Sequence, residues 1–267
     1  MTKTAPRFGP GFVLELSPTM KQKQFIPEIS ALEHCWLQAN VSVPQDKQYL
    51  MIVLHGRGDS LDSFLSIKEE LKIPEMNYLL VNAPRAYDEG FSWYAFEPNQ
   101  KAGILRSRER LLKLVSELKD FGWAPNKIFL YGFSQGALLS CDLTMFGPHI
   151  FAGTIAISGY IYFFEEWKKN LKPSAFQTPW LVTHGIYDDL LPVSETRDQV
   201  QKLLGVGLPI TWREFLKEHE IELRIETQFI RKWVYARMKR DKKTSVPKSQ
   251  EIYQTSSSNS KQRFKSF

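Results

Sequence analysis

Residues 127–136, KIFLYGFSQG, carry the feature that decides the fold, because an apolar run ends there in the motif GFSQG. Residues 127–131 are typical of a buried strand, and residues 135–145 have the pattern of a helix. A G-x-S-x-G motif between a strand and a helix predicts a sharp turn whose glycines avoid clashes. The serine hydroxyl then stands above the sheet, near the amino terminus of the helix. Ser134 is therefore a candidate nucleophile, and a small-residue strand–helix connection is the structural alternative.

Strand and helix patterns alternate on both sides of this motif. The expected strands are residues 36–43, 49–54, 77–82, 127–131, 153–157, 180–183 and 209–216, and the expected helices are 61–71, 103–121, 135–145, 194–204 and 222–238. We expect the helix 194–204 to begin at a serine N-cap and to stop at Gly205. Such alternation predicts a mostly parallel, doubly wound α/β sheet with right-handed crossovers and helices on both faces. In a sheet of this kind, chemistry gathers at the carboxyl ends of the strands.

A serine nucleophile needs a base, and the base needs a carboxylate that orients it. On the α/β-hydrolase framework the acid and then the base follow the serine along the chain. The segment HGIYDDLLP at 184–192 follows an expected strand and offers Asp188 and Asp189. The histidines are His34, His55, His149, His184 and His219. Only His219 follows these acids, so His219 is the predicted base, and the residues themselves leave both aspartates open as the acid.

Two backbone N–H groups are also required, because the attacked carbonyl oxygen becomes an anion. One should come from Gln135, the residue after Ser134. The second should come from the loop HGRGD at 55–59, where glycines on either side of Arg57 let its amide turn toward the site. The Arg57 side chain could contact substrate or point to solvent. A phosphate-binding loop is the alternative for HGRGD, but no Lys-Ser/Thr follows it and the glycine spacing does not fit a dinucleotide site.

Several motifs of the chain resemble one family. They are LHGRGD at 54–59, NAPR with SWY at 82–94, GFSQGA at 132–137, SGY at 158–160, HGxxDxLxP at 184–192 and, more loosely, FLKEHEI around His219. This set resembles the carboxylesterase/phospholipase family, which includes acyl-protein thioesterases and lysophospholipases. The resemblance implies an α/β-hydrolase fold without a large lid domain and without a cofactor or metal. It also favours Asp188 over Asp189, which implies the triad Ser134, Asp188 and His219 with backbone donors at Arg57 and Gln135. Glu218 departs from the glycine that many members carry before the histidine.

Aromatic residues near these motifs could form an acyl pocket. We expect Trp93, Tyr94 and Tyr160 to contact the substrate, and a core position is the alternative for each of them. The predicted activity is hydrolysis, through an acyl-enzyme, of short- to medium-chain carboxylesters, lysophospholipids or acyl thioesters. The alternatives are a catalytically inactive hydrolase-fold binding protein, or a hydrolase domain that its basic carboxyl-terminal segment recruits to an anionic surface.

The positive charge of the chain is concentrated at its carboxyl end. Residues 237–267 hold nine Lys or Arg and two acidic residues, a net charge of +7, whereas the whole chain carries +6. We therefore expect an irregular amino-terminal arm at 1–30, the α/β-hydrolase domain at 31–240, and a basic, disordered tail at 241–267. The tail could contact lipid peripherally, but its most economical interpretation is a solvated end, and no nucleic-acid partner is expected.

The composition excludes other classes of protein. No apolar run approaches the length of a transmembrane helix, and MTKTAPRFGPGF lacks the apolar core of a secretory signal. The two cysteines, Cys35 and Cys141, lie far apart in the sequence and are expected to be reduced. These features predict a soluble, cytoplasmic monomer or homodimer that acts on a small-molecule or lipid ester.

Overall fold

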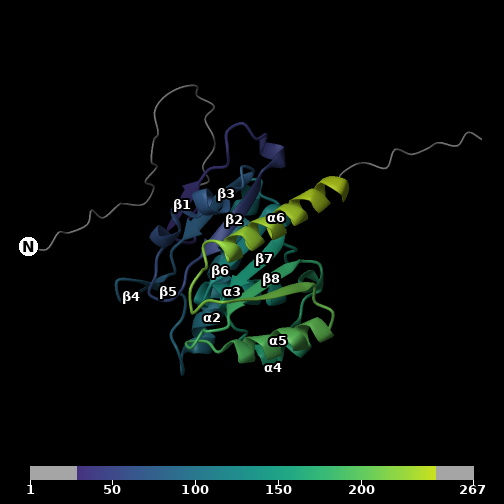
Figure 1. Ribbon diagram of the computed structural model, residues 1–267. Helices are drawn as coiled ribbons and strands as arrows, with labels where there is room; N and C mark the ends of the chain where they lie inside the picture. Colours follow the sequence, from purple (N-terminus) through teal and green to yellow (C-terminus); the bar gives the residue numbers. More distant parts are fainter. Residues whose placement is uncertain (1–28, 245–267) are drawn as a thin grey trace, which may run out of the picture.

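The computed structural model describes residues 29–244, which form a seven-stranded sheet between two layers of helices (Figure 1). The strand order is β1-β3-β2-β6-β7-β8-β9. All neighbouring strands are parallel except β1 and β3, which are antiparallel. The strands are β1 (His34–Leu37), β2 (Tyr49–Leu54), β3 (Met76–Val81), β6 (Ile128–Phe133), β7 (Gly153–Ile157), β8 (Trp180–Gly185) and β9 (Ile210–Phe215). The predicted α/β-hydrolase sheet is confirmed.

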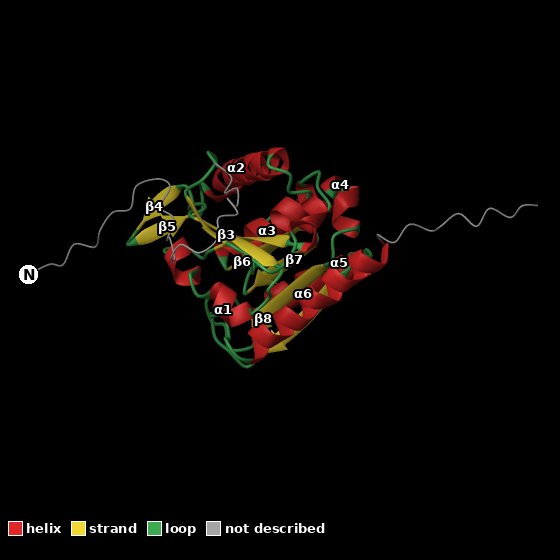
Figure 2. Cartoon of the chain, turned by 90° about the horizontal axis from the view of Figure 1, so that it is seen from above, coloured by secondary structure: helices red, strands yellow, loops and turns green. Residues whose placement is uncertain are grey.

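Helices cover both faces of the sheet. They are α1 (Ile67–Leu71), α2 (Gln100–Asp120), α3 (Gln135–Phe146), α4 (Phe164–Asn170), α5 (Val193–Gly205) and α6 (Ile225–Thr244). Figure 2 shows α2, α3 and α4 on one face and α1 and α6 on the other. Among the helices of residues 29–244, none combines the length and the apolar character that a membrane span requires.

The central strands are buried on both sides, as parallel strands between helix layers must be. On β2, Leu50, Ile52 and Leu54 pack with α2 and α3, while Met51 and Val53 pack with α1 and α6. All six residues of β2 are buried, and the same holds for β3. This explains why both strands read as continuous apolar runs rather than as alternating patterns.

Several element boundaries differ from expectation; for example, the expected helix 61–71 is a short 3-10 turn at Leu61–Phe64 followed by α1. Strand β1 ends at Leu37 rather than continuing to residue 43, because the Ala39 amide donates to the Asn77 side chain (2.9 Å) and Val41 is exposed. Helix α5 begins after Pro192 and includes Gly205 in its last turn. The glycine with left-handed backbone is Gly207, with φ +91°, so the expected stop at Gly205 was wrong by two residues.

The structure describes a few residues beyond each border of the predicted domain 31–240. Ile29 packs into the core, and Ser30 bonds the carboxylate of Glu117, although both fall in the expected arm. Helix α6 continues to Thr244, beyond the expected border at residue 240. The rest of the arm and of the tail lies outside the described residues, so the three-part division of the chain remains a prediction.

A small hairpin beside the sheet was not predicted from the sequence. Its strands are β4 (Arg85–Tyr87) and β5 (Gly90–Ser92), which follow the carboxyl end of β3. The Gly58 amide donates to the Phe91 carbonyl (2.8 Å), and the Phe91 amide donates to the Asp59 carbonyl (2.8 Å). A Cβ atom on Gly90 would lie only 2.5 Å from the Gly58 oxygen, so glycine is needed for this close approach. The hairpin thereby supports the loop at residues 55–59.

Candidate active site

Ser134 lies on the predicted turn between β6 and α3. Its backbone has φ +53° and ψ −114°, a conformation that costs a non-glycine residue about 1–3 kcal/mol. The turn is held because the Ser134 amide donates to the Ile157 carbonyl (3.0 Å). The motif glycines are sterically required: a Cβ on Gly132 would lie 2.1 Å from the Gly136 oxygen, and one on Gly136 would lie 2.1 Å from the Leu54 oxygen. The strand–turn–helix geometry inferred for this motif is therefore present.

The structure brings Ser134, His219 and Asp188 together at the carboxyl ends of β6, β8 and β9. The Ser134 Oγ lies 3.0 Å from His219 Nε2, and His219 Nδ1 lies 2.8 Å from Asp188 Oδ2. An ionised carboxylate only accepts hydrogen bonds, so Nδ1 carries a proton and a neutral imidazole leaves Nε2 free to accept from the serine hydroxyl. The Asp188 side chain is fully buried, whereas the next residue, Asp189, is exposed. Of the two candidate acids, Asp188 is thus the one that reaches the imidazole.

A second imidazole contacts the same carboxylate. His184 Nε2 lies 3.3 Å from Asp188 Oδ2 and donates to the Leu191 carbonyl at 2.8 Å. The other carboxylate oxygen, Oδ1, accepts from the Leu191 amide (2.8 Å). Burial lowers the pKa of His184, so this imidazole is neutral near neutral pH. This contact was not predicted, because spacing along the chain does not show which histidines share one carboxylate.

The two predicted backbone donors belong to segments that adjoin Ser134. The Gln135 amide belongs to the first turn of α3, where N–H groups lack helical acceptors. A Cβ on Gly56 would lie 3.4 Å from Ser134 Cβ, so the loop that contains Arg57 runs directly past the serine. Within residues 29–244, no main-chain carbonyl accepts from the Arg57 amide. Both predicted donors thus belong to segments next to Ser134, and their role in holding an oxyanion remains a prediction.

The side chain of Gln135 fixes this corner of the site. Its Oε1 accepts from the Trp93 amide (3.0 Å) and from Ser92 Oγ (3.2 Å), and its Nε2 donates to the Tyr94 carbonyl (2.9 Å). Gln135 is buried. These three bonds join the start of α3 to the end of the hairpin and to the two residues that follow it, a role that the sequence did not reveal.

The Arg57 residue is exposed, in agreement with the solvent-facing alternative, and its guanidinium packs against neighbouring side chains. The guanidinium stacks between two aromatic rings, with its central carbon 4.1 Å from the centre of the Tyr87 ring and 4.2 Å from that of Phe96. It also donates to the Tyr87 hydroxyl (2.6 Å). This exposed stack braces the outer side of the 55–59 loop.

The expectation that Trp93 and Tyr94 contact substrate needs correction. Trp93 is 1% exposed and Tyr94 is 0% exposed, so neither presents a surface to a bound molecule. The Trp93 indole instead donates to the His55 carbonyl (2.9 Å), which supports the 55–59 loop from within. Tyr160 is partly buried, and its hydroxyl contacts the Gln100 side chain. Aromatic composition could not separate a pocket wall from a core residue.

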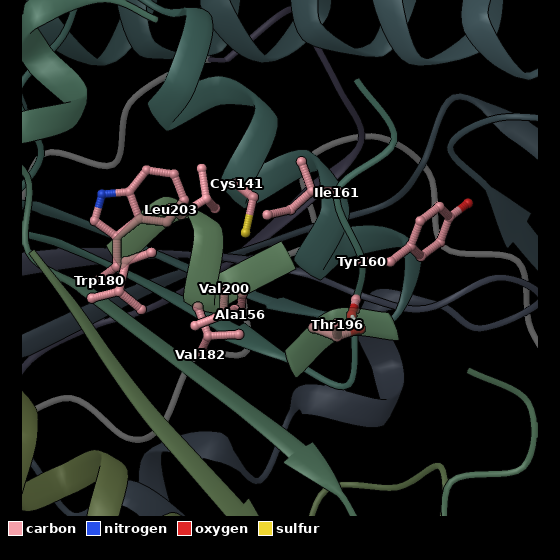
Figure 3. A pocket seen from close by; sticks show the side chains of 11 residues that line it. Cys141, Ala156, Tyr160, Ile161, Trp180, Val182, Thr196, Val200 and Leu203 are labelled. Carbon is pink, nitrogen blue, oxygen red and sulfur yellow. Dashed lines mark hydrogen bonds between the residues drawn. The ribbon is translucent and has the colours of Figure 1, made fainter. Parts of the chain in front are cut away.

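A small cavity lies next to the site, between α3, α5 and the sheet (Figure 3). Figure 3 places Tyr160 at one margin of this cavity and Trp180 at the other, with Cys141 and Val200 between them. Its volume is about 10 Å³, which fits one water molecule and no acyl chain. A larger cavity of about 270 Å³ is lined by residues 30–33 and 82–84 with Phe91 and Arg110. Its lining does not include Ser134, Asp188 or His219.

The fold and this site define an α/β-hydrolase. The chain belongs to the phospholipase/carboxylesterase family, whose model matches residues 38–236. Acyl-protein thioesterase 1 of Emericella nidulans is 30% identical over 184 residues, which cover 59% of this chain and 77% of that protein. A probable inactive carboxylesterase of Oryza sativa is 26% identical over 203 residues, or 69% of this chain and 82% of that protein. The crystal structure of Arabidopsis thaliana SOBER1 matches with a TM-score of 0.66 and 20% identity, covering 72% of this chain and 99% of that chain, and supports the fold alone.

Proposed function

We propose that the protein is a serine hydrolase that cleaves carboxylic esters or thioesters through an acyl-enzyme. The observation that carries this proposal is the continuous hydrogen-bonded chain from Ser134 Oγ to His219 and on to the buried carboxylate of Asp188. Membership of a family of phospholipases and carboxylesterases supports the same reaction class.

The first half of the reaction forms the acyl-enzyme. His219 Nε2 removes the hydroxyl proton while Ser134 Oγ attacks the substrate carbonyl carbon. The carbonyl oxygen becomes an anion, which the amides of Arg57 and Gln135 stabilise by hydrogen bonds. Asp188 stabilises the imidazolium that has formed. The bond from carbon to the leaving oxygen or sulfur then breaks, and the imidazolium gives its proton to the leaving group.

The second half releases the acid. His219 removes a proton from a water molecule, whose oxygen attacks the acyl carbon. The same two amides hold the second oxyanion. When that intermediate collapses, Ser134 Oγ leaves and recovers a proton from His219, so the enzyme is regenerated without any cofactor.

The substrates that we propose are short- to medium-chain carboxylesters, lysophospholipids and acyl thioesters. A relative named acyl-protein thioesterase supports the thioester candidate. The adjacent cavity is too small for an acyl chain, so we propose that the chain lies along the outer surface of the site. Hydrolysis of p-nitrophenyl esters of increasing length, compared with a lysophospholipid and an acyl thioester, tests these choices. A rate that does not depend on acyl length would contradict a dedicated acyl-binding surface.

The decisive test of the reaction class combines labelling and kinetics. A fluorophosphonate should label the wild-type protein at Ser134, and Ser134→Ala should lose both labelling and ester hydrolysis. Full hydrolysis by Ser134→Ala would refute the proposal. The alternative of an inactive binding protein has one supporting observation, the rice relative with that designation, and would predict no turnover by the wild-type protein.

We further propose that the protein acts in the cytoplasm as a monomer or homodimer. The role of the basic tail as a lipid anchor is a separate candidate, which comes from the charge of residues 237–267. Removing residues 245–267 should leave ester hydrolysis unchanged in solution. If the tail anchors the protein, its removal should also abolish salt-sensitive binding to anionic vesicles.

A further inference from the structure

A buried ion pair lies beneath the loop that carries His219. Lys217 and Glu226 both have fully buried side chains, and the Lys217 Nζ lies 2.7 Å and 2.9 Å from the two Glu226 carboxylate oxygens. The same Nζ donates to the Glu220 carbonyl at 2.6 Å. An ammonium group has three N–H donors, so every donor of Lys217 is used inside the protein.

These bonds join residues on both sides of His219 in the sequence. Lys217 precedes His219 by two residues, Glu220 follows it, and Glu226 lies in the first turn of α6. The Glu226 carboxylate also accepts from the Glu222 amide (2.9 Å), on the far side of the loop. Residues 216–224, which join β9 to α6, are therefore tied to one buried charge pair.

The same loop is attached to the loop that carries Asp188. The Tyr187 amide donates to the Lys217 carbonyl (3.1 Å). A Cβ on Gly185 would lie 2.3 Å from the Lys217 oxygen and 2.5 Å from the Glu218 oxygen, so the two loops touch where only glycine fits. A movement of Lys217 would therefore change the position of His219 relative to Asp188.

We propose that Lys217 and Glu226 are positioning residues, which hold His219 at the distance and angle required to accept a proton from Ser134. This inference rests on the proposed role of His219 as the base. The pair touches neither Ser134 nor the expected position of substrate, and it acts mainly through the His219 loop. Lys217 also places a positive charge near the acid: burial lowers the pKa of Lys217, while Glu226 and Asp188 oppose that decrease.

A substitution that removes both charges can separate this positioning role from a contribution to the stability of the fold. A buried ion pair often contributes little net stability, because desolvation offsets the attraction of its charges. An apolar pair of similar volume can therefore keep the fold while it removes the three directed bonds of Lys217. Loss of catalysis in a protein of normal stability would then report on the surroundings of His219 and not on unfolding.

The test is the double variant Lys217→Met with Glu226→Leu. We expect kcat for a p-nitrophenyl ester to fall at least about tenfold, with KM within about twofold of wild type, since only proton transfer is affected. The rate of labelling by a fluorophosphonate should fall in parallel. The low-field proton signal of His219 Nδ1–H, bonded to Asp188, should weaken in the NMR spectrum.

A matched control comes from another largely buried ion pair. Arg108 and Asp142 join α2 to α3 through two 2.6 Å bonds. The double variant Arg108→Met with Asp142→Leu should keep wild-type kcat. If Lys217→Met with Glu226→Leu does not fold, the isosteric Glu226→Gln decides the question, because it keeps the shape of the pair and weakens its charge.

The outcomes are distinguishable. Wild-type kcat and labelling in the folded double variant, or in Glu226→Gln when the double variant is unfolded, would overturn the inference. Activity that survives His219→Ala would instead overturn the proposed function. A fall in kcat in both double variants alike would also overturn the inference, since it would show a general effect of losing a buried pair.

Discussion

Replacing Asp188 by asparagine tests the orientation of the base with the smallest change in shape. In the wild-type protein Asp188 Oδ1 accepts from the Leu191 amide and Oδ2 accepts from His219 Nδ1, both at 2.8 Å. An asparagine has one oxygen and one NH₂ group, so it can satisfy only one of these donors. Its oxygen should face the Leu191 amide, because that donor belongs to the fixed main chain. The NH₂ group then faces His219.

This reversal changes the tautomer of the imidazole. With a donor opposite Nδ1, the proton of a neutral His219 must move to Nε2, which then cannot accept the Ser134 proton. Loss of the correct tautomer in a serine–histidine–aspartate site lowers kcat by about 10⁴. At about 1.36 kcal/mol for each factor of ten, this is about 5.4 kcal/mol of transition-state stabilisation. KM should change little, because Asp188 is buried away from substrate.

The assay is steady-state hydrolysis of a p-nitrophenyl ester, together with thermal unfolding followed by circular dichroism. The matched control is Asp189→Asn, which alters the exposed neighbour and should keep wild-type kcat. Activity of folded Asp188→Asn within about tenfold of wild type would refute this role of Asp188. Equal losses in the two variants would also refute it, since they would indicate a general effect on the loop.

Three further predictions concern stability. Gly136→Ala should unfold at a much lower temperature, since its Cβ would lie 2.1 Å from a main-chain oxygen, whereas Gly205→Ala, with open space around it, should be neutral or stabilising in the same thermal scan. Arg108→Leu should cost about 3–5 kcal/mol in urea unfolding, because it leaves the buried carboxylate of Asp142 unpaired. Burial already raises the pKa of Asp142. The loss of unfolding free energy in Arg108→Leu should therefore be largest at neutral pH, where the carboxylate is charged, and should shrink as the pH falls and the carboxylate is protonated. Burial lowers the pKa of His55 below its ordinary value of 6.5. The stability that the neutral imidazole contributes is therefore complete above pH 6.5 and is lost as the pH falls through the lowered pKa. Urea unfolding at several pH values would detect this loss.

The sheet was predictable because its strands are chemically distinct from the rest of the chain. The runs that became β2, β3 and β7 are apolar on both faces, and each ends near a glycine, asparagine or serine. The hairpin formed by β4 and β5 has no such signal, because β4 is three exposed residues whose pairing depends on contacts with the 55–59 loop. Long-range contacts of this kind leave no periodic pattern in the sequence.

The geometry of the candidate site was predictable to the extent that chain order constrains it. The order of serine, acid and base along the chain singled out His219, and the structure places its imidazole between Ser134 and Asp188. The supporting residues were not predictable in the same way. A lysine such as Lys217, in a polar stretch, reads as an exposed charge until the fold buries it against Glu226.

The backbone of Ser134 has an evolutionary consequence. A positive φ is tolerated by glycine with little cost, whereas the serine found there holds its main chain about 1–3 kcal/mol above a relaxed turn. Selection for thermal stability alone would therefore favour glycine at this position and would eliminate the hydroxyl. If Ser134 is the proposed nucleophile, selection for turnover opposes this drift, so descendants of this chain that lose their substrate should acquire glycine at residue 134 before the surrounding fold decays.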